Sequence, residues 1–181
     1  MKKTSIIPDS SFFICFLDDI EKPELIQELL KNDKFDFFLG RITFDEIKKS
    51  KNFQKIANES EQKIIIYDYF EYGEVVRIFF SESEIRKGEH EVFVISFIFT
   101  FLNNPFIAIL DDEPAKKFFK NNIPEKASSV MGTIGFIKIC SCECKIFIKA
   151  TAINILELIK KSKFFVSNKI IEVAIEQIRA C

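Results

Sequence analysis

The stretch SIIPDSSFFICFL, residues 5–17, begins as a short β-branched run that stops at Pro8-Asp9 and continues as an apolar helix. A strand, an acidic residue and then a helix form an order typical of α/β proteins, in which the strand ends carry the chemistry. We therefore expect an α/β fold in which Asp9 lies at the edge of a sheet.

The same alternation continues along the chain. Apolar runs predict further strands over residues 35–40, 63–70, 106–110 and 127–131. Helical spacing predicts helices over residues 23–32, 43–50, 89–104, 113–122, 151–165 and 167–178. Thr43 and Glu46 have the spacing of a capping box, and residues 74–87 are ambiguous between helix and strand. This order predicts a Rossmann-like three-layer α/β/α sandwich with a central parallel β-sheet, formed by one domain over residues 1–181 that ends in helices over 149–181.

Composition and charge narrow the class of protein. The chain has 181 residues, 48% of them apolar, and few Gly and Pro residues, as expected for a globular domain. Its net charge of −1 does not indicate a nucleic-acid binder, and its three lysine clusters are interpreted as solvated helix faces. No signal peptide is recognised, and the longest apolar run, residues 92–102, is about half of what crosses a bilayer. We expect a cytoplasmic protein without a membrane span.

Three of the five cysteines fall in the run CSCEC, at Cys140, Cys142 and Cys144. Such a run raises the question of a zinc site, but no fourth Cys or His lies near it and the usual spacing is absent. We expect these residues to be reduced thiols at a helix end or in a loop.

Acidic residues mark the ends of four predicted elements. They are Asp9, Glu46, the pair Glu89 and Glu91, and the pair Asp111 and Asp112. Each position also has a local interpretation as a helix cap, a capping-box acid or a first-turn acid favoured by the helix dipole. In a parallel sheet, however, such positions gather at one edge, where carboxylates repel one another unless a cation is present. Mg²⁺ or Mn²⁺ is the expected cofactor, because these ions bind through carboxylates together with a substrate phosphate.

Five segments, in order, resemble motifs of the PIN domain family, in its compact prokaryotic branch that includes toxin-type ribonucleases. The segments are IIPDSSFFICFL, ITFDEIKKS, GEHEVFVIS, ILDDEPAKK and MGTIGFI, within residues 5–137. Three departures from the family pattern are mild, since Ser10 stands where Thr is common, Val92 replaces Ala and Lys116 replaces Arg. None of them removes a carboxylate.

The resemblance implies a Rossmann-like fold whose acidic pocket binds Mg²⁺ or Mn²⁺ and cleaves single-stranded RNA, often in a homodimer. Many members are toxins paired with a small antitoxin protein. The residues that the resemblance carries over as core carboxylates are Asp9, Glu46, Glu91 and Asp112, with Ser11 as a hydroxyl near the metal and Thr133 as a support of the pocket. Glu89 and Asp111 match acids that recur in this branch, and their contact with metal is left open.

The single histidine, His90, lies between Glu89 and Glu91 and is interpreted as a surface or supporting residue. Because consecutive helical residues are separated by about 100°, the two glutamates cannot both face one ion from within a regular helix. We predict Glu91 as the ligand.

The predicted function is a metal-dependent endoribonuclease. The main alternative is a catalytically inactive PIN-like module that binds nucleic acid or protein; the near-neutral charge favours this alternative, whereas the intact acids favour the enzyme. A phosphoacceptor receiver domain is a weaker alternative, because it requires an acid pair directly after its first strand, where this chain has Asp9-Ser10-Ser11.

Overall fold

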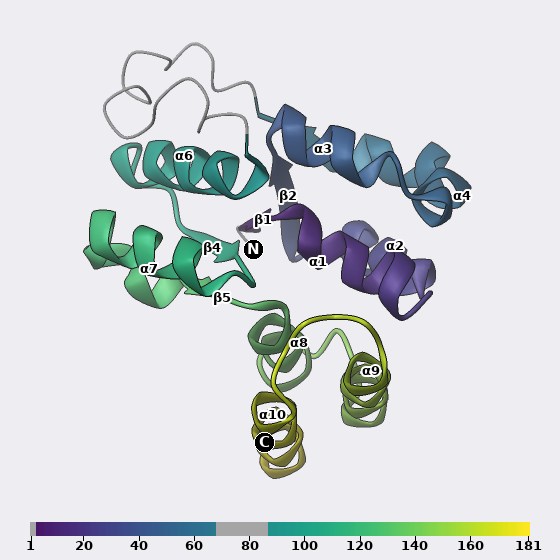
Figure 1. Cartoon of the computed structure of the whole chain (residues 1–181). Coiled ribbons are helices and arrows are strands. Elements are labelled where there is room, and N and C mark those ends of the chain that lie inside the picture. Colours follow the sequence, from purple (N-terminus) through teal and green to yellow (C-terminus); the bar gives the residue numbers. More distant parts are fainter. Residues whose placement is uncertain (1–2, 68–86) are drawn as a thin grey trace.

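A parallel β-sheet stands at the centre of the molecule (Figure 1). The computed structural model describes residues 3–67 and 87–181. Within these ranges the strand order is β3 (Ile64–Ile66), β2 (Phe35–Leu39), β1 (Thr4–Pro8), β4 (Phe106–Ile109) and β5 (Val130–Met131), and neighbouring strands run parallel. The predicted α/β class with a central parallel sheet is therefore confirmed.

Helices connect the strands and follow the last of them. The α-helices are α1 (Ser10–Ile14), α2 (Pro23–Lys31), α3 (Arg41–Ile47), α4 (Lys51–Ser60), α6 (Gly88–Phe101), α7 (Glu113–Asn122), α8 (Thr133–Cys142), α9 (Lys149–Lys161) and α10 (Asn168–Ala180). A π-helical segment, Cys15–Asp19, continues α1, and 3₁₀ segments span Glu61–Lys63 and Pro124–Ser129. Within the described ranges, no helix is long and apolar enough to span a bilayer.

Helices cover both faces of the sheet. Successive strand residues point to opposite faces, so Ile6 of β1 belongs to one apolar cluster and Ile7 to the other. The Ile6 face is covered by helices that include α1, α2 and α8, where the Phe12 ring packs against Phe37 and Phe136 at centroid distances of 6.3 and 5.6 Å. The Ile7 face is covered by α6 and α7, and α9 and α10 pack beside α8 (Figure 1). These layers are those of the predicted Rossmann-like sandwich.

Three local expectations differ from the structure. Helix α3 begins at Arg41, so Thr43 lies inside its first turn and the predicted capping box with Glu46 is wrong. Helix α8 was not anticipated at all, although it follows β5 directly. The strand expected over residues 63–70 is observed at Ile64–Ile66; residues 68–70, and nearly all of the undecided stretch 74–87, lie outside the described residues.

A disulfide bond joins Cys142, at the end of α8, to Cys181, which follows α10. The expectation of reduced thiols throughout CSCEC is therefore wrong for Cys142, whereas Cys140 and Cys144 are free. Sequence could not show this pairing, because the partners are 39 positions apart and meet only when α10 packs beside α8. The bond fastens the C-terminal helix to the body of the protein.

Candidate active site

The sheet has a topological switch point between β1 and β4. The chain runs outward from β1 to β2 and β3, and then returns to the other side of β1 for β4 and β5. In open α/β sheets, ligands bind at such a point, outside the carboxyl ends of the strands. Asp9 directly follows β1, and its amide donates to the Ile109 carbonyl of β4 at 2.9 Å. Asp111 follows the same end of β4, so the fold brings both acids to the switch point as predicted.

Asp9 is held by its own helix and by a neighbouring hydroxyl. Its Oδ1 accepts a hydrogen bond from the Ser10 amide at 2.6 Å, which makes it the N-cap of α1. Its Oδ2 accepts from the Ser11 hydroxyl at 3.1 Å. Ser11 is also within hydrogen-bonding reach of Asp111 and lowers the pKa of that acid. Ser11 therefore links the acid after β1 to the acid after β4.

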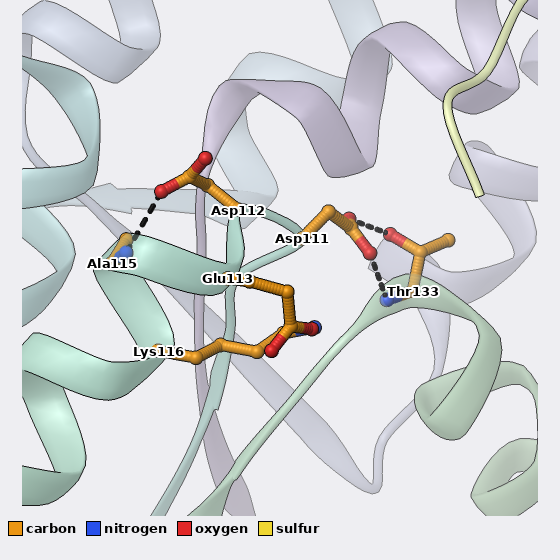
Figure 2. A network of polar contacts seen from close by, with 6 residues as sticks. All are labelled: Asp111, Asp112, Glu113, Ala115, Lys116 and Thr133. Carbon is orange, nitrogen blue, oxygen red and sulfur yellow. Dashed lines mark hydrogen bonds and ion pairs between the residues drawn. The ribbon is translucent and has the colours of Figure 1, made fainter. Parts of the chain in front are cut away.

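The two aspartates after β4 point in different directions (Figure 2). Asp111 Oδ1 accepts from the Thr133 amide at 2.9 Å, and Oδ2 accepts from the Thr133 hydroxyl at 2.5 Å. Gly132 makes room for this contact, because a Cβ there would lie 2.8 Å from Asp111 Oδ1. Asp112 is exposed and caps α7, accepting from the Ala115 amide at 2.8 Å. Asp111 is thus linked to Asp9 through Ser11, whereas Asp112 takes the capping role that was the local interpretation of this pair. We use the name Asp9 cluster for Asp9, Ser11 and Asp111 together with Thr43, Glu46 and Glu89, which are described below.

The two glutamates at the start of α6, Glu89 and Glu91, also differ in their surroundings. Glu91 is only 1% exposed, and its two carboxylate oxygens accept the amide hydrogens of Ile42 and Thr43 at 2.9 and 2.7 Å. It therefore caps α3 from another helix, and Gly40 is required beside it, because a Cβ there would lie 2.3 Å from Glu91 Cδ. The charge of Glu89 instead acts on Asp9 and raises the pKa of that acid. The two glutamates thus differ in role: both oxygens of Glu91 are held by α3, whereas Glu89 contributes charge near Asp9.

Gly88, at the start of α6, packs closely against oxygens of α3 and of Asp9. A Cβ at Gly88 would lie 3.2 Å from Glu46 Oε2, 3.3 Å from Asp9 Oδ1 and 3.4 Å from Thr43 Oγ1. Thr43 is 1% exposed, and among the described residues its hydroxyl has no hydrogen-bond partner. An unpaired buried hydroxyl is uncommon in proteins and calls for an explanation. Sequence reasoning missed this role of Thr43 because it assigned the residue to a capping box.

Burial raises the pKa values of two acids at this site, Asp9 and Asp111. Burial raises the pKa of Asp9 to about 6, and the charges of Glu89 and Glu46 add to the effect. Hydrogen bonds from Ser10 and Ser11 oppose it. Burial also raises the pKa of Asp111, against the hydrogen bonds from Thr133 and the nearby charge of Lys116. The acids are therefore gathered in a partly desolvated position where negative charge is unfavourable.

The donors of the Asp9 cluster fit a hard divalent cation, but they are not arranged as a closed cage. All of them are carboxylate or hydroxyl oxygens, the ligands that Mg²⁺ and Mn²⁺ prefer. Across residues 3–67 and 87–181, no three or more His, Cys, Asp or Glu side chains are grouped as metal ligands. Mg²⁺ commonly keeps several waters and binds through one or two carboxylates plus a substrate phosphate, so such a cage is not required.

His90 packs against an aromatic ring of α7. Its ring is half-buried and lies 6.4 Å, centroid to centroid, from the ring of Phe118 on α7. This position between α6 and α7 agrees with the interpretation of His90 as a supporting residue.

Comparison with known proteins gives no further guide to the chain. No family model, no curated protein and no solved structure matches it.

Proposed function

We propose that this protein is a divalent-metal-dependent endoribonuclease of the PIN-like type, which cleaves single-stranded RNA. One observation carries the proposal: the carboxylates of Asp9 and Glu46 and the unpaired Thr43 hydroxyl lie close together around Gly88, and Asp9 stands at the switch point of the sheet. The choice of RNA, of a homodimer and of a toxin role with a small antitoxin rests on the resemblance of five sequence segments to that family.

The geometry changes which acids we assign to the metal. Asp9, Glu46, Glu89 and Asp111 are the proposed Mg²⁺ or Mn²⁺ residues, because Asp9 lies close to Glu46, is influenced by the charge of Glu89 and shares Ser11 with Asp111. Glu91 is instead buried with both oxygens on amides of α3, and Asp112 is exposed at the start of α7. A bound divalent cation neutralises charge on the phosphodiester and lowers the pKa of an attacking water. It would also offset the repulsion that raises the pKa of Asp9.

The other residues of the site position these acids. The Ser11 hydroxyl donates to Asp9 Oδ2, and Thr133 holds both oxygens of Asp111 through its amide and hydroxyl. The Thr43 hydroxyl is buried and has no partner among the described residues, which leaves a free donor close to Asp9 and Glu46. No protein nucleophile is needed, which suits a chain whose single histidine packs against Phe118 of α7.

The test is cleavage of a fluorescently labelled single-stranded RNA with Mg²⁺ or Mn²⁺, with EDTA as the blank. We expect Asp9→Asn and Asp111→Asn each to lower the rate by about 100-fold or more, as losses at metal sites do. Asp112→Asn is the matched control; it keeps the cap of α7 and should leave cleavage within about 2-fold, because an Asn cap is equivalent to Asp. Binding of Mn²⁺ alone, followed by electron paramagnetic resonance, supplies a readout that does not depend on turnover.

Two results would contradict the proposal. One is the absence of metal-stimulated cleavage on any single-stranded RNA, and the other is an Asp112→Asn variant as damaged as Asp111→Asn. Thr43→Val tests the carrying observation directly, since it removes only the unpaired hydroxyl. It should preserve folding yet slow cleavage by about 10-fold, the lower limit for residues that support a metal site.

A binding module without catalysis is the second candidate, and the near-neutral net charge of −1 favours it. Such a module would bind RNA or a partner protein equally well with EDTA and with Mg²⁺, and Asp9→Asn would not weaken binding. For the toxin role, a small antitoxin-like reading frame directly upstream of the gene is the expected observation.

A further inference from the structure

A hollow of about 440 Å³ adjoins the Asp9 cluster on the side of Asp111. It is lined by Asp111, Asp112, Glu113 and Lys116, which follow β4, and by Phe165 in the loop between α9 and α10. Its floor is apolar and includes Ile134 and Ile170. Its volume lies within the range of sites that bind small molecules, so it is large enough to take one unit of a polymer held at the acids.

The hollow continues into a second one between α8 and α10. This second hollow has a volume of about 310 Å³, and it shares Ile134, Gly135 and Ile170 with the first. Val173 adds to its apolar floor, and the two lysines Lys138 and Lys169 line it as well. Together the two hollows, which we call the α8–α10 groove, form one continuous track that leads away from the acids.

Phe165 is the most exposed apolar side chain of the groove. It is 100% exposed, and the neighbouring Ile170 and Val173 are 50% and 44% exposed. A ring presented in this way offers a flat face to a nucleobase, and the groove lysines offer charge to phosphates. An apolar floor, one aromatic ring and lysines along the same track are the features with which proteins hold single strands without reading their sequence.

We propose that single-stranded RNA leaves the acidic site along the α8–α10 groove, with one base stacked on Phe165 and the following phosphates near Lys138 and Lys169. This inference rests on the proposed function, because the groove is assigned to RNA through its continuity with the acids at Asp111. The disulfide between Cys142 and Cys181 ties α10 to α8 and so holds the two walls of the groove together.

The experiment measures binding of a fluorescein-labelled decauridine by anisotropy, in the Asp9→Asn background so that the RNA stays intact. Phe165→Ala should weaken binding about 5- to 150-fold, the loss that follows removal of one base-stacking ring. Lys169→Gln should weaken binding less and reduce the slope of log affinity against log salt by about 0.7. A 2-aminopurine base placed in the same RNA should lose its fluorescence quenching with Phe165→Ala, which reports stacking directly.

Phe101 supplies the matched control. It is 82% exposed at the far end of α6, about 20 Å along the helix axis from Gly88, and Phe101→Ala should leave the affinity unchanged. Thermal unfolding of each variant checks the fold, which the exposure of both rings should leave intact.

The outcomes separate the two proposals. If metal-dependent cleavage is present but Phe165→Ala binds RNA as tightly as the parent, the groove assignment is wrong and the nuclease proposal stands. If RNA binding depends on Phe165 but no cleavage occurs with any metal, the groove assignment stands and the nuclease proposal fails. A groove that instead joins two copies of this chain would give a dimer that Phe165→Ala dissociates in size-exclusion chromatography, with no change in RNA affinity, and this would overturn the assignment.

Discussion

The sharpest prediction concerns Glu91, which the structure makes a cap for a helix other than its own. We consider Glu91→Gln, a change that keeps the size of the side chain but removes its charge. Glu91 is buried, and its oxygens accept from the Ile42 and Thr43 amides at 2.9 and 2.7 Å. A glutamine can accept only one of these hydrogen bonds, because its amide nitrogen is a donor and would face the second backbone N–H.

The expected decrease in the free energy of unfolding has two parts. Leaving one buried amide hydrogen without an acceptor costs about 1–3 kcal/mol. Losing the negative charge at the N-terminus of α3 costs a further amount of about 0.3–1 kcal/mol. We therefore expect Glu91→Gln to lower the free energy of unfolding by about 1–4 kcal/mol. For a chain of this size, that is a fall of about 3–16 °C in melting temperature.

The assay is thermal and urea unfolding followed by circular dichroism, with Glu89→Gln as the matched control. Glu89 lies two residues away on the same helix, is half-exposed, and adds repulsion to Asp9 rather than a cap. Its substitution should leave stability unchanged or raise it slightly, while weakening Mn²⁺ binding. A Glu91→Gln protein as stable as the parent would refute the capping role, and a strongly destabilised Glu89→Gln protein would refute the division of this pair.

Two further predictions concern pH and the disulfide bond. Burial raises the pKa of Asp9 from 3.8 to about 6, so between these pH values the folded state binds more protons than the unfolded state. Without metal, the free energy of unfolding should therefore fall by about 3 kcal/mol as the pH rises from 4 through 6. Urea unfolding in EDTA should show this loss in the parent and not in Asp9→Asn, and an identical pH dependence in both would contradict it. Cys142→Ser removes the disulfide, which closes a loop of 39 positions, and the gain in chain entropy of the unfolded state should lower the free energy of unfolding by about 4 kcal/mol. Cys144→Ser changes a free thiol and should leave the free energy of unfolding nearly unchanged. Equal melting temperatures for Cys142→Ser and the parent under oxidising conditions would count against the bond to Cys181.

The order of strands and helices could be predicted from sequence because it depends on local patterns. Apolar runs bounded by Pro or acidic residues predict strands such as β1 and β4, and side-chain periodicity predicts helices such as α2 and α7. Helix α8 was missed because it is apolar on nearly every side and has no side-chain cap, so its sequence carries no clear start.

The order of elements in the sequence also predicts the edge of the sheet at which the acids gather. It does not predict which acid of each neighbouring pair belongs to the site. Asp9 and Asp111 meet because parallel strands β1 and β4 end at the same edge, which follows from chain direction alone. The choice between Asp111 and Asp112 depends on where Thr133 lies after β5, because its amide donates to Asp111. The choice between Glu89 and Glu91 depends on where the first amides of α3 lie, because they donate to Glu91.

By itself, then, the sequence determined the α/β class, the parallel sheet and the edge at which the acids gather, because strand ends and helix starts are local properties of the chain. Only the tertiary structure decided that Glu91 caps α3, that the Thr43 hydroxyl is left unpaired beside Gly88, and that Cys142 pairs with Cys181. Each of these depends on contacts between segments far apart in sequence. The physical reason is that a polar group takes whichever partner packing brings within hydrogen-bonding distance, and no local pattern records that partner.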